Sequence, residues 1–215
     1  MTSRRRIIFL CGEAEGEAFR EHVESISPGF ETQWVGTAAS LDFATKQDTE
    51  RTRLISFLTD VIVPGEIIER LGLTPYNIHP GSPEFPGAHG LNFAIFEEAT
   101  SYGVTVHEMT PSVDTGPIVL TERFPLPPGS DLLTFGDQVF RHAISLADRV
   151  ICHAVETDDP LPRAPDLWSG PQRTKAKFTA LLTSADYLLP HDRERLARAA
   201  GPHLKRYQKA HRSYG

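Results

Sequence analysis

Two groups of polar residues follow apolar stretches at positions where they could do chemistry together. Asn77 and His79 follow one stretch, and Asp114 opens the turn Asp114-Thr115-Gly116-Pro117 after another. An amide donates N–H groups to a developing oxyanion, an imidazole adds a second donor or a proton, and a carboxylate accepts the proton of an attacking amine. This combination suits acyl transfer to an amine without a serine or cysteine that becomes acylated.

Each of these residues also has a purely structural interpretation. Asn77 could cap a turn, His79 could be a core histidine with satisfied hydrogen bonds, and Asp114 could simply form its turn. A zinc site is a further alternative, because suitable ligand types are present in His79, His89, His107 and Asp114. Their spacing matches no compact ligand motif, and His107 lies in an alternating stretch where it can face the core. We therefore expect no metal at these residues.

The elements before Asn77 indicate a parallel α/β sheet. Strands are predicted at 7–11, 31–35 and 54–58, and helices at 14–23 and 64–71, with Pro64 at a first helical position. Strands that alternate with helices need right-handed crossovers, and such sheets bind ligands at the carboxyl ends of their strands. We expect a Rossmann-like, mostly parallel sheet with flanking helices.

The elements after Asn77 surround the second polar group. The prolines and glycines of 75–90 predict a loop of fixed shape. Beyond it we expect a helix at 91–100, strands at 103–109 and 118–124, and a long helix at 134–155 that begins with a capping box of Thr134 and Asp137. A linker rich in Asp and Pro at 158–165 leads to a short, helical C-terminal extension. We divide the chain into a catalytic domain at 1–160 and an extension at 161–215, which could cover the sheet edge or form a homodimer.

The composition excludes several classes of protein. The 215 residues are 40% hydrophobic and carry a net charge of -6, which predicts one soluble domain and argues against broad nucleic-acid binding. Residues 190–215 hold seven Lys or Arg against two acidic residues, which we interpret as a solvated helix face. The first apolar run is too short for a signal peptide or a membrane span. Cys11 and Cys152 are predicted to be inert core residues, as fits a cytoplasmic protein.

Four short segments follow one another through the middle of the chain. They are Tyr76-Asn77-Ile78-His79-Pro80, Phe85-Pro86-Gly87-Ala88-His89, Gly103-Val104-Thr105-Val106-His107 and Asp114-Thr115-Gly116-Pro117-Ile118. In this order they resemble the signature of the 10-formyltetrahydrofolate-dependent formyltransferases, and the resemblance extends over about 54–123. It implies the formyltransferase fold, 10-formyltetrahydrofolate as co-substrate, no metal, and transfer of a formyl group to an amine.

The resemblance also implies roles for individual residues. Asn77 and His79 would stabilise the tetrahedral intermediate, and Asp114 would position water or take the proton of the amine. The residues implied for folate binding are Phe57, Leu58, Val61, Ile62, Val63, Val113, Thr115 and Gly116. Those implied for substrate binding are Gly12, Pro80, Gly81, Ser82 and His107, of which His107 would support the site from below.

Departures from the family pattern limit which molecules could accept the formyl group. Glycinamide ribonucleotide formyltransferases hold a phosphate in the loop that corresponds to 12–17, where this chain has three glutamates that would repel it. The residues after Pro165 are too few for the C-terminal barrel of methionyl-tRNA formyltransferases. We therefore expect a small amine acceptor, such as an amino sugar nucleotide. The alternatives are a hydrolase that uses water as acceptor and a non-catalytic folate-binding or regulatory module.

Overall fold

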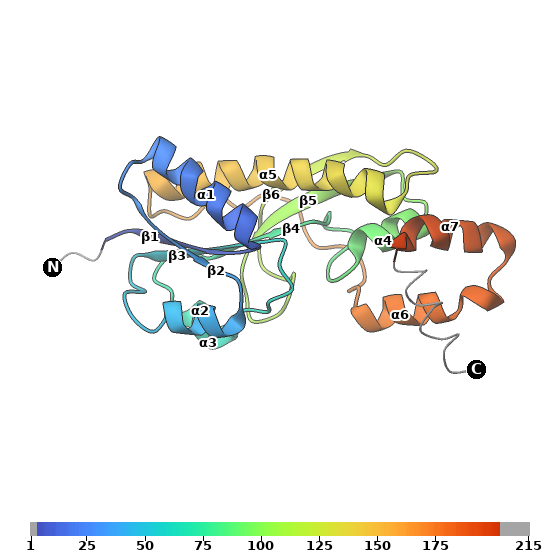
Figure 1. Ribbon diagram of the computed structural model, residues 1–215, viewed down its shortest axis with the longest axis horizontal. Helices are drawn as coiled ribbons and strands as arrows, with labels where there is room; N and C mark the ends of the chain where they lie inside the picture. The colour runs from blue at the N-terminus through green and yellow to red at the C-terminus, as the bar shows by residue number, and fades with distance from the viewer. Residues whose placement is uncertain (1–3, 203–215) are drawn as a thin grey trace. The chain divides into compact units, whose positions relative to one another are not determined.

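The computed structural model describes residues 4–202 and contains a six-stranded sheet and several α-helices (Figure 1). Its elements, in chain order, are β1 (Arg6–Leu10), α1 (Glu13–Ile26), β2 (Glu31–Val35), α2 (Ala38–Ala44), β3 (Thr52–Phe57), α3 (Gly65–Arg70), β4 (Tyr76–His79), α4 (Gly90–Phe96), β5 (Ser101–Glu108), β6 (Ile118–Pro125), α5 (Leu132–Glu156), α6 (Lys175–Thr183), the 3-10 helix η1 (Ala185–Tyr187) and α7 (Pro190–Ala200).

The sheet has the strand order β2-β1-β3-β4-β5-β6. β1 pairs in parallel with β2 and β3, and β3 pairs in parallel with β4. β4 then pairs with β5 in the antiparallel direction. The predicted α/β fold class is therefore confirmed. The sheet is mixed, and the change from parallel to antiparallel pairing occurs at β4, which carries Asn77 and His79.

By its internal contacts the chain falls into two compact units. The first comprises Met1–His79, Thr105–Thr121 and Ala143–Leu167, and the second comprises Pro80–Val104, Glu122–His142 and Trp168–Gly215. The boundaries fall within or next to β5, β6 and α5. Because the units interleave along the chain, they do not test the expected division at residue 160, which stays a prediction.

The first unit has two apolar layers on the two faces of its strands. In Figure 1, α2 and α3 lie on one face, while α1 and the part of α5 that belongs to this unit lie on the other. Every residue of β3 is buried, as expected for a strand covered on both faces. On the α2 side the core consists of Ile8, Leu10, Val35, Leu41, Ala44, Leu54 and Ile67. On the α1 side, the ring of Phe19 packs against Phe9 and Phe57, with centroids 5.4 and 5.1 Å apart.

The helix predicted at 14–23 is α1, which begins at Glu13, so the segment 12–17 that corresponds to the phosphate loop of the family is the first turn of a helix. Three predictions about local structure were wrong. Part of the loop expected at 75–90 is the strand β4, which pairs with both β3 and β5. Pro64 is the N-cap of α3 and not its first residue. α5 starts at Leu132 and is capped by Asp131, whose Oδ1 accepts from the backbone N–H groups of residues 133 and 134 at 2.9 and 3.0 Å.

The two cysteines, both predicted to be core residues, differ in burial. Cys11 is 3% exposed, which confirms it as a core residue. Cys152 is only partly buried, because it lies beside the buried stripe of α5 formed by Ala143, Leu146, Ala147, Val150, Ile151 and Ala154 and not within it. The prediction that Cys152 belongs to the core was wrong.

The predicted linker at 158–165 is fixed to the first unit by hydrogen bonds. The buried Arg53 donates from Nη2 to the carbonyl oxygens of Asp158 and Asp159, at 2.8 and 3.1 Å. The hydroxyl of Tyr76 accepts from the backbone N–H of Leu161 at 2.7 Å, and burial is the main cause that raises the pKa of this hydroxyl. The linker is therefore held by residues of β3 and β4.

The second unit contains α4, α6, η1 and α7. Arg173 lies over the rings of Phe85 and Phe93, and Asn92 Nδ2 donates to the carbonyl oxygen of Ala199 at 2.7 Å. Among the predicted basic tail residues, Arg195 and Arg198 form ion pairs with Glu98. Lys205, Arg206, Lys209 and Arg212 lie outside the described residues. Within 4–202, no helix has the length and apolar character needed to cross a membrane.

We predict that Leu54→Ala lowers the free energy of unfolding by about 2–5 kcal/mol, because the side chain is 0% exposed in the central strand of the sheet. Leu167→Ala is the matched control, since Leu167 is 80% exposed and its loss should change stability by less than about 0.5 kcal/mol. Urea unfolding of both variants measures the difference. Equal effects would contradict the placement of Leu54 in the core.

Candidate active site

The pairing of β4 with β5 places four polar side chains on one face of the sheet. Alternate residues of a strand point to the same face, so Asn77 and His79 share a face, while Tyr76 and Ile78 are buried on the other. The antiparallel register sets Asn77 opposite His107 and His79 opposite Thr105. Directly opposed residues of an antiparallel pair have neighbouring side chains. Strand pairing thus brings Asn77, His79, His107 and Thr105 together in a compact patch.

A tight loop between β5 and β6 brings Asp114 to this patch. Asp114 has a φ of +49°, in the left-handed region that aspartate tolerates better than most residues, and it is 4% exposed. The loop is tied internally by Thr110 Oγ1 and Thr115 Oγ1, which lie 2.9 Å apart and each contact the carbonyl oxygen of Ser112. Gly116 lies so close to the carbonyl oxygen of Glu108 that an added Cβ would clash with it. Only glycine at position 116 lets the loop pass this close to Glu108, and this close passage places Asp114 next to Asn77 and His107.

Both oxygens of the Asp114 carboxylate are engaged. Oδ1 lies 3.2 Å from His107 Nε2 and 3.5 Å from Asn77 Nδ2. Oδ2 lies 3.4 Å from His79 Nδ1. Asn77 Nδ2 also lies 3.1 Å from His107 Nε2. The structure therefore brings together the three predicted catalytic residues, and His107 completes the cluster.

The hydrogen bonds fix how the donors of the cluster are arranged. His107 Nδ1 faces the carbonyl oxygen of Glu108 at 2.8 Å, so this nitrogen carries a hydrogen. Nε2 faces both Asn77 Nδ2 and Asp114 Oδ1, so it accepts from the amide when it carries no hydrogen and donates to the carboxylate when it carries one. Asn77 Nδ2 also faces Asp114 at the limit of hydrogen-bond distance. The Asn77 amide has two N–H groups, so one can contact these neighbours while the second turns to another oxygen.

His107 was predicted to contact substrate and to support the site from below. Its side chain is 4% exposed and lies against Asn77 and Asp114. Because so little of the side chain is exposed, its position fits the supporting role better than the role of contacting a substrate. The cluster of Asn77, His79, His107 and Asp114 includes no hydroxyl or thiol, so it provides donors for an oxyanion and a carboxylate for a proton.

The residues predicted for folate binding lie on two loops of the first unit. Leu58 has a φ of +46° and ends β3, and Val61 and Val63 pack on the α2-side core. Ile62 is 67% exposed and Val113 is 46% exposed, unlike most residues of their type. The loops approach each other, because an added Cβ on Gly65 would lie 3.2 Å from Pro111 Cβ.

The other predicted folate contacts differ in exposure. Phe57 is 1% exposed and its ring packs against Phe19, so its side chain belongs to the core and only its backbone could meet a ligand. Thr115 is exposed, and Gly116 is buried against Glu108.

The residues predicted for substrate binding lie in both units. Gly12 is exposed and caps the start of α1. Pro80, Gly81 and Ser82 belong to the second unit, where Tyr102 donates its hydroxyl to the Pro80 carbonyl oxygen at 2.7 Å and Ser82 is 1% exposed.

Trp34, at the end of β2, was missed by the sequence analysis. Its Nε1 donates to the carbonyl oxygen of Cys11 at 3.1 Å, its indole lies against Gly16, and it is 44% exposed. The signal in the sequence was the pair Gly12 and Gly16, one helical turn apart, where the second glycine leaves room for a large ring. The indole thus lies beside the first turn of α1.

Of the four residues considered as zinc ligands, His79, His107 and Asp114 lie together in the first unit. His89 belongs to the second unit, where its ring stacks on Phe178 with centroids 4.5 Å apart.

Comparison with known proteins gives a family match over the same region. Residues 54–149 match the family model described as formyl transferase. A methionyl-tRNA formyltransferase from Syntrophus aciditrophicus is 30% identical over 91 residues, which are 42% of this chain and 29% of that protein. The chain thus spans less than a third of the length of this curated relative.

Solved structures share the fold at low sequence identity. A sugar N-formyltransferase from a Shewanella species has a TM-score of 0.72 at 19% identity, and the match covers 91% of this chain and 87% of that one. An N-formyltransferase from Helicobacter canadensis, in complex with folinic acid and dTDP-3-aminofucose, has a TM-score of 0.66 at 14% identity over 91% of this chain and 80% of that one. These matches establish the fold.

We predict that Gly116→Ala destabilises the protein by about 1–3 kcal/mol, because the new methyl group would push the Asp114 loop away from Glu108. Gly136→Ala is the matched control: no atom lies within 4 Å of its added Cβ, and alanine in a helix should be neutral or stabilising by up to about 1 kcal/mol. Chemical unfolding compares the two. A Gly116→Ala variant as stable as the Gly136→Ala variant would contradict the close approach.

Proposed function

We propose that the protein transfers a formyl group from 10-formyltetrahydrofolate to the amine of a small acceptor, and the match of residues 54–149 to the formyl transferase family model supports this proposal. The observation that carries the proposal is the cluster of Asn77, His79 and His107 around the buried carboxylate of Asp114. The cluster has the groups that this reaction needs, and it includes no nucleophile that would form an acyl-enzyme.

The amide and the imidazole of β4 would act on the formyl oxygen. When the nitrogen of a neutral amine forms a bond to the formyl carbon, negative charge develops on the oxygen. The second N–H of Asn77 and a ring N–H of His79 lie on the same face of β4 and would donate to that oxygen. The intermediate then collapses, the bond between carbon and the folate nitrogen breaks, and that nitrogen takes a proton as tetrahydrofolate leaves.

Asp114 would accept the proton of the attacking amine. The amine becomes positively charged as its nitrogen forms the new bond, and a carboxylate held at the cluster stabilises that charge and accepts the proton. Contact with His79 through Oδ2 would let the proton pass on through the imidazole. His107 acts as a positioning residue, because it orients both Asn77 and Asp114.

The exposed apolar side chains of the two loops support a folate site next to this cluster. Ile62 and Val113 have apolar surface in solvent that a flat ring system would cover. The loop that carries Val113 also carries Asp114, so a bound ring would lie within reach of the carboxylate. The Helicobacter canadensis relative was solved in complex with folinic acid, which supports a folate as the co-substrate.

For the acceptor we propose an amino sugar, carried on a nucleotide. The Helicobacter canadensis relative was solved with dTDP-3-aminofucose, and the Shewanella relative is a sugar N-formyltransferase. The acidic first turn of α1 disfavours a phosphate at that helix end, which argues against a free ribonucleotide amine held in the glycinamide ribonucleotide manner.

The direct test is turnover of 10-formyltetrahydrofolate by the purified protein, followed by absorbance, alone and then with a panel of nucleotide-linked amino sugars and amino acids. Release of tetrahydrofolate that depends on one amino sugar would establish the transferase. Release without any acceptor would favour the hydrolase. Binding without release under all conditions would favour the folate-binding module.

We predict that Asn77→Ala lowers kcat by about a hundred- to a thousand-fold, because one oxyanion donor is lost. Folate affinity, measured by fluorescence quenching, should change little, and Leu167→Ala should retain full turnover. Wild-type turnover by the Asn77→Ala variant would remove Asn77 from the mechanism.

We also predict that Asp114→Asn abolishes turnover while the affinity for folate is retained. The substitution keeps the shape of the side chain, but one carboxylate oxygen becomes an NH2 group that can accept neither a hydrogen bond nor the proton. Binding is measured by calorimetry and turnover by absorbance. If both were lost together and the unfolding midpoint fell as well, the residue would be structural and its proposed catalytic role would fail.

A further inference from the structure

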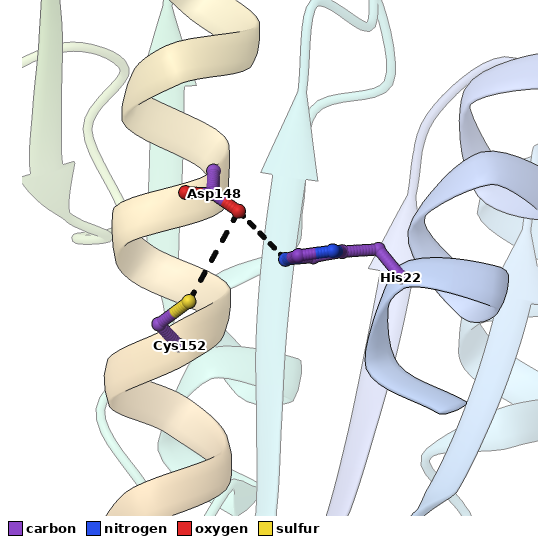
Figure 2. Close-up of side chains that lie close together, drawn as sticks. All are labelled: His22, Asp148 and Cys152. Carbon is purple, nitrogen blue, oxygen red and sulfur yellow. Dashed lines mark hydrogen bonds and ion pairs between the residues drawn. The ribbon is translucent and has the colours of Figure 1, made fainter. Parts of the chain in front are cut away.

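A second cluster of titratable side chains lies between α1 and α5 in the first unit, apart from the residues used so far. It consists of His22 on α1 and of Asp148 and Cys152 on α5 (Figure 2). His22 Nε2 lies 2.6 Å from Asp148 Oδ1, and Cys152 Sγ lies 4.0 Å from the same oxygen. Among the described residues, this is the one group of three His, Cys, Asp or Glu side chains whose ligand atoms all lie within 4.8 Å of one another.

The position of the cluster allows an ion to enter. The side chain of His22 is 34% exposed and that of Asp148 is 54% exposed. Asp148 and Cys152 are one helical turn apart on the flank of α5 that faces α1, as Figure 2 shows. Side chains one turn apart on a helix can share a ligand, and His22 approaches them from the neighbouring helix.

We propose that His22, Asp148 and Cys152 bind a divalent transition-metal ion of the zinc class, with water in the fourth position. Imidazole nitrogen, carboxylate oxygen and thiolate sulfur are the three ligand types that zinc uses in proteins, and three protein ligands with one open position form a common tetrahedral arrangement. Magnesium and calcium prefer oxygen ligands only, so they do not fit a set that includes sulfur and nitrogen.

The geometry needs one small rearrangement. Two ligands of a tetrahedral zinc ion lie about 3.4 Å apart, as follows from metal–ligand distances of about 2.1 Å. The separation of 4.0 Å between Cys152 and Asp148 is near this value, while the separation of 2.6 Å between His22 and Asp148 is that of a hydrogen bond. A metal ion would replace the shared proton, and the half-exposed Asp148 side chain would rotate outward to make room.

The ligands also match the charge of a dication. A coordinating thiol must lose its proton, which is released to solvent when the metal binds. With a carboxylate, a thiolate and a neutral imidazole, the protein ligands then balance the charge of the ion.

The consequence of such binding would be a link between two helices that cover the same face of the sheet. The ion would join α1 and α5, and a ligand that binds only the folded state stabilises it by mass action. The proposal does not involve folate or an acceptor, so its test uses no turnover measurement.

Cobalt(II) is the probe for the test, because a cobalt–thiolate bond gives a charge-transfer band in the near ultraviolet. We expect the full chain, first treated with a chelator, to bind one equivalent of Co²⁺ with this band, and Zn²⁺ to displace it. Cys152→Ser should abolish the band, and His22→Gln should weaken Co²⁺ binding by at least about ten-fold, as for loss of a ligand. The matched control is His153→Gln, whose histidine is next to Cys152 but contacts the Asp159 carbonyl oxygen.

A second measurement separates ligation from folding. Zn²⁺ should raise the unfolding temperature of the wild type and of His153→Gln, but not that of His22→Gln or Cys152→Ser. It should also protect Cys152 from alkylation, while Cys11 reacts little in any case, because burial and, less strongly, Glu15 raise its thiol pKa to about 12. The absence of a one-to-one cobalt complex, a band that survives Cys152→Ser, or equal effects of the two histidine variants would overturn the proposal.

Discussion

The carboxylate of Asp114 is the group on which the rest of the candidate active site depends. It is 4% exposed, and a buried carboxylate costs several kcal/mol unless donors surround it. The donors come from β4 and β5, whose register sets Asn77 opposite His107. A shift of one residue in that register would turn both side chains to the other face of the sheet and leave the carboxylate without them. The Asp114 carboxylate can therefore be buried only if β4 and β5 pair in this register.

The opposite face of β4 makes this register hard to change. Tyr76 and Ile78 are fully buried there, and the Tyr76 hydroxyl is tied to the backbone of the segment that follows α5. Arg53 holds the same segment from β3. The polar face can thus keep an energetically costly arrangement, since the apolar face and its hydrogen bonds fix the strand. Strain at Asp114, with its positive φ, is maintained in the same way, by the close contact of Gly116 with Glu108.

Sequence patterns predicted those parts of the molecule that follow local rules. The apolar run of β1 and the apolar stripe of α5 marked these elements to within a few residues, and the ordered motifs selected Asn77, His79 and Asp114, whereas the prolines and glycines of 75–90 hid the short strand β4. The sequence could not show that Asp131 and not Thr134 caps α5, since both are good capping residues. It also misplaced Cys152 and missed Trp34. The surroundings of both depend on contacts between elements far apart in the chain, which no local period encodes.

The contrast between local patterns and long-range contacts explains why the sequence revealed the first cluster of titratable groups and not the second. In the first, the reactive residues come from a strand pair and a turn, so each lies in a short motif of its own. In the second, Asp148 and Cys152 have a helical spacing that is common on any helix surface, and His22 gives no sign of its partners. Only the packing of α1 beside α5 joins the three. A cluster built from side chains that two helices turn toward each other is therefore a property of the fold, which the sequence of either helix alone does not reveal.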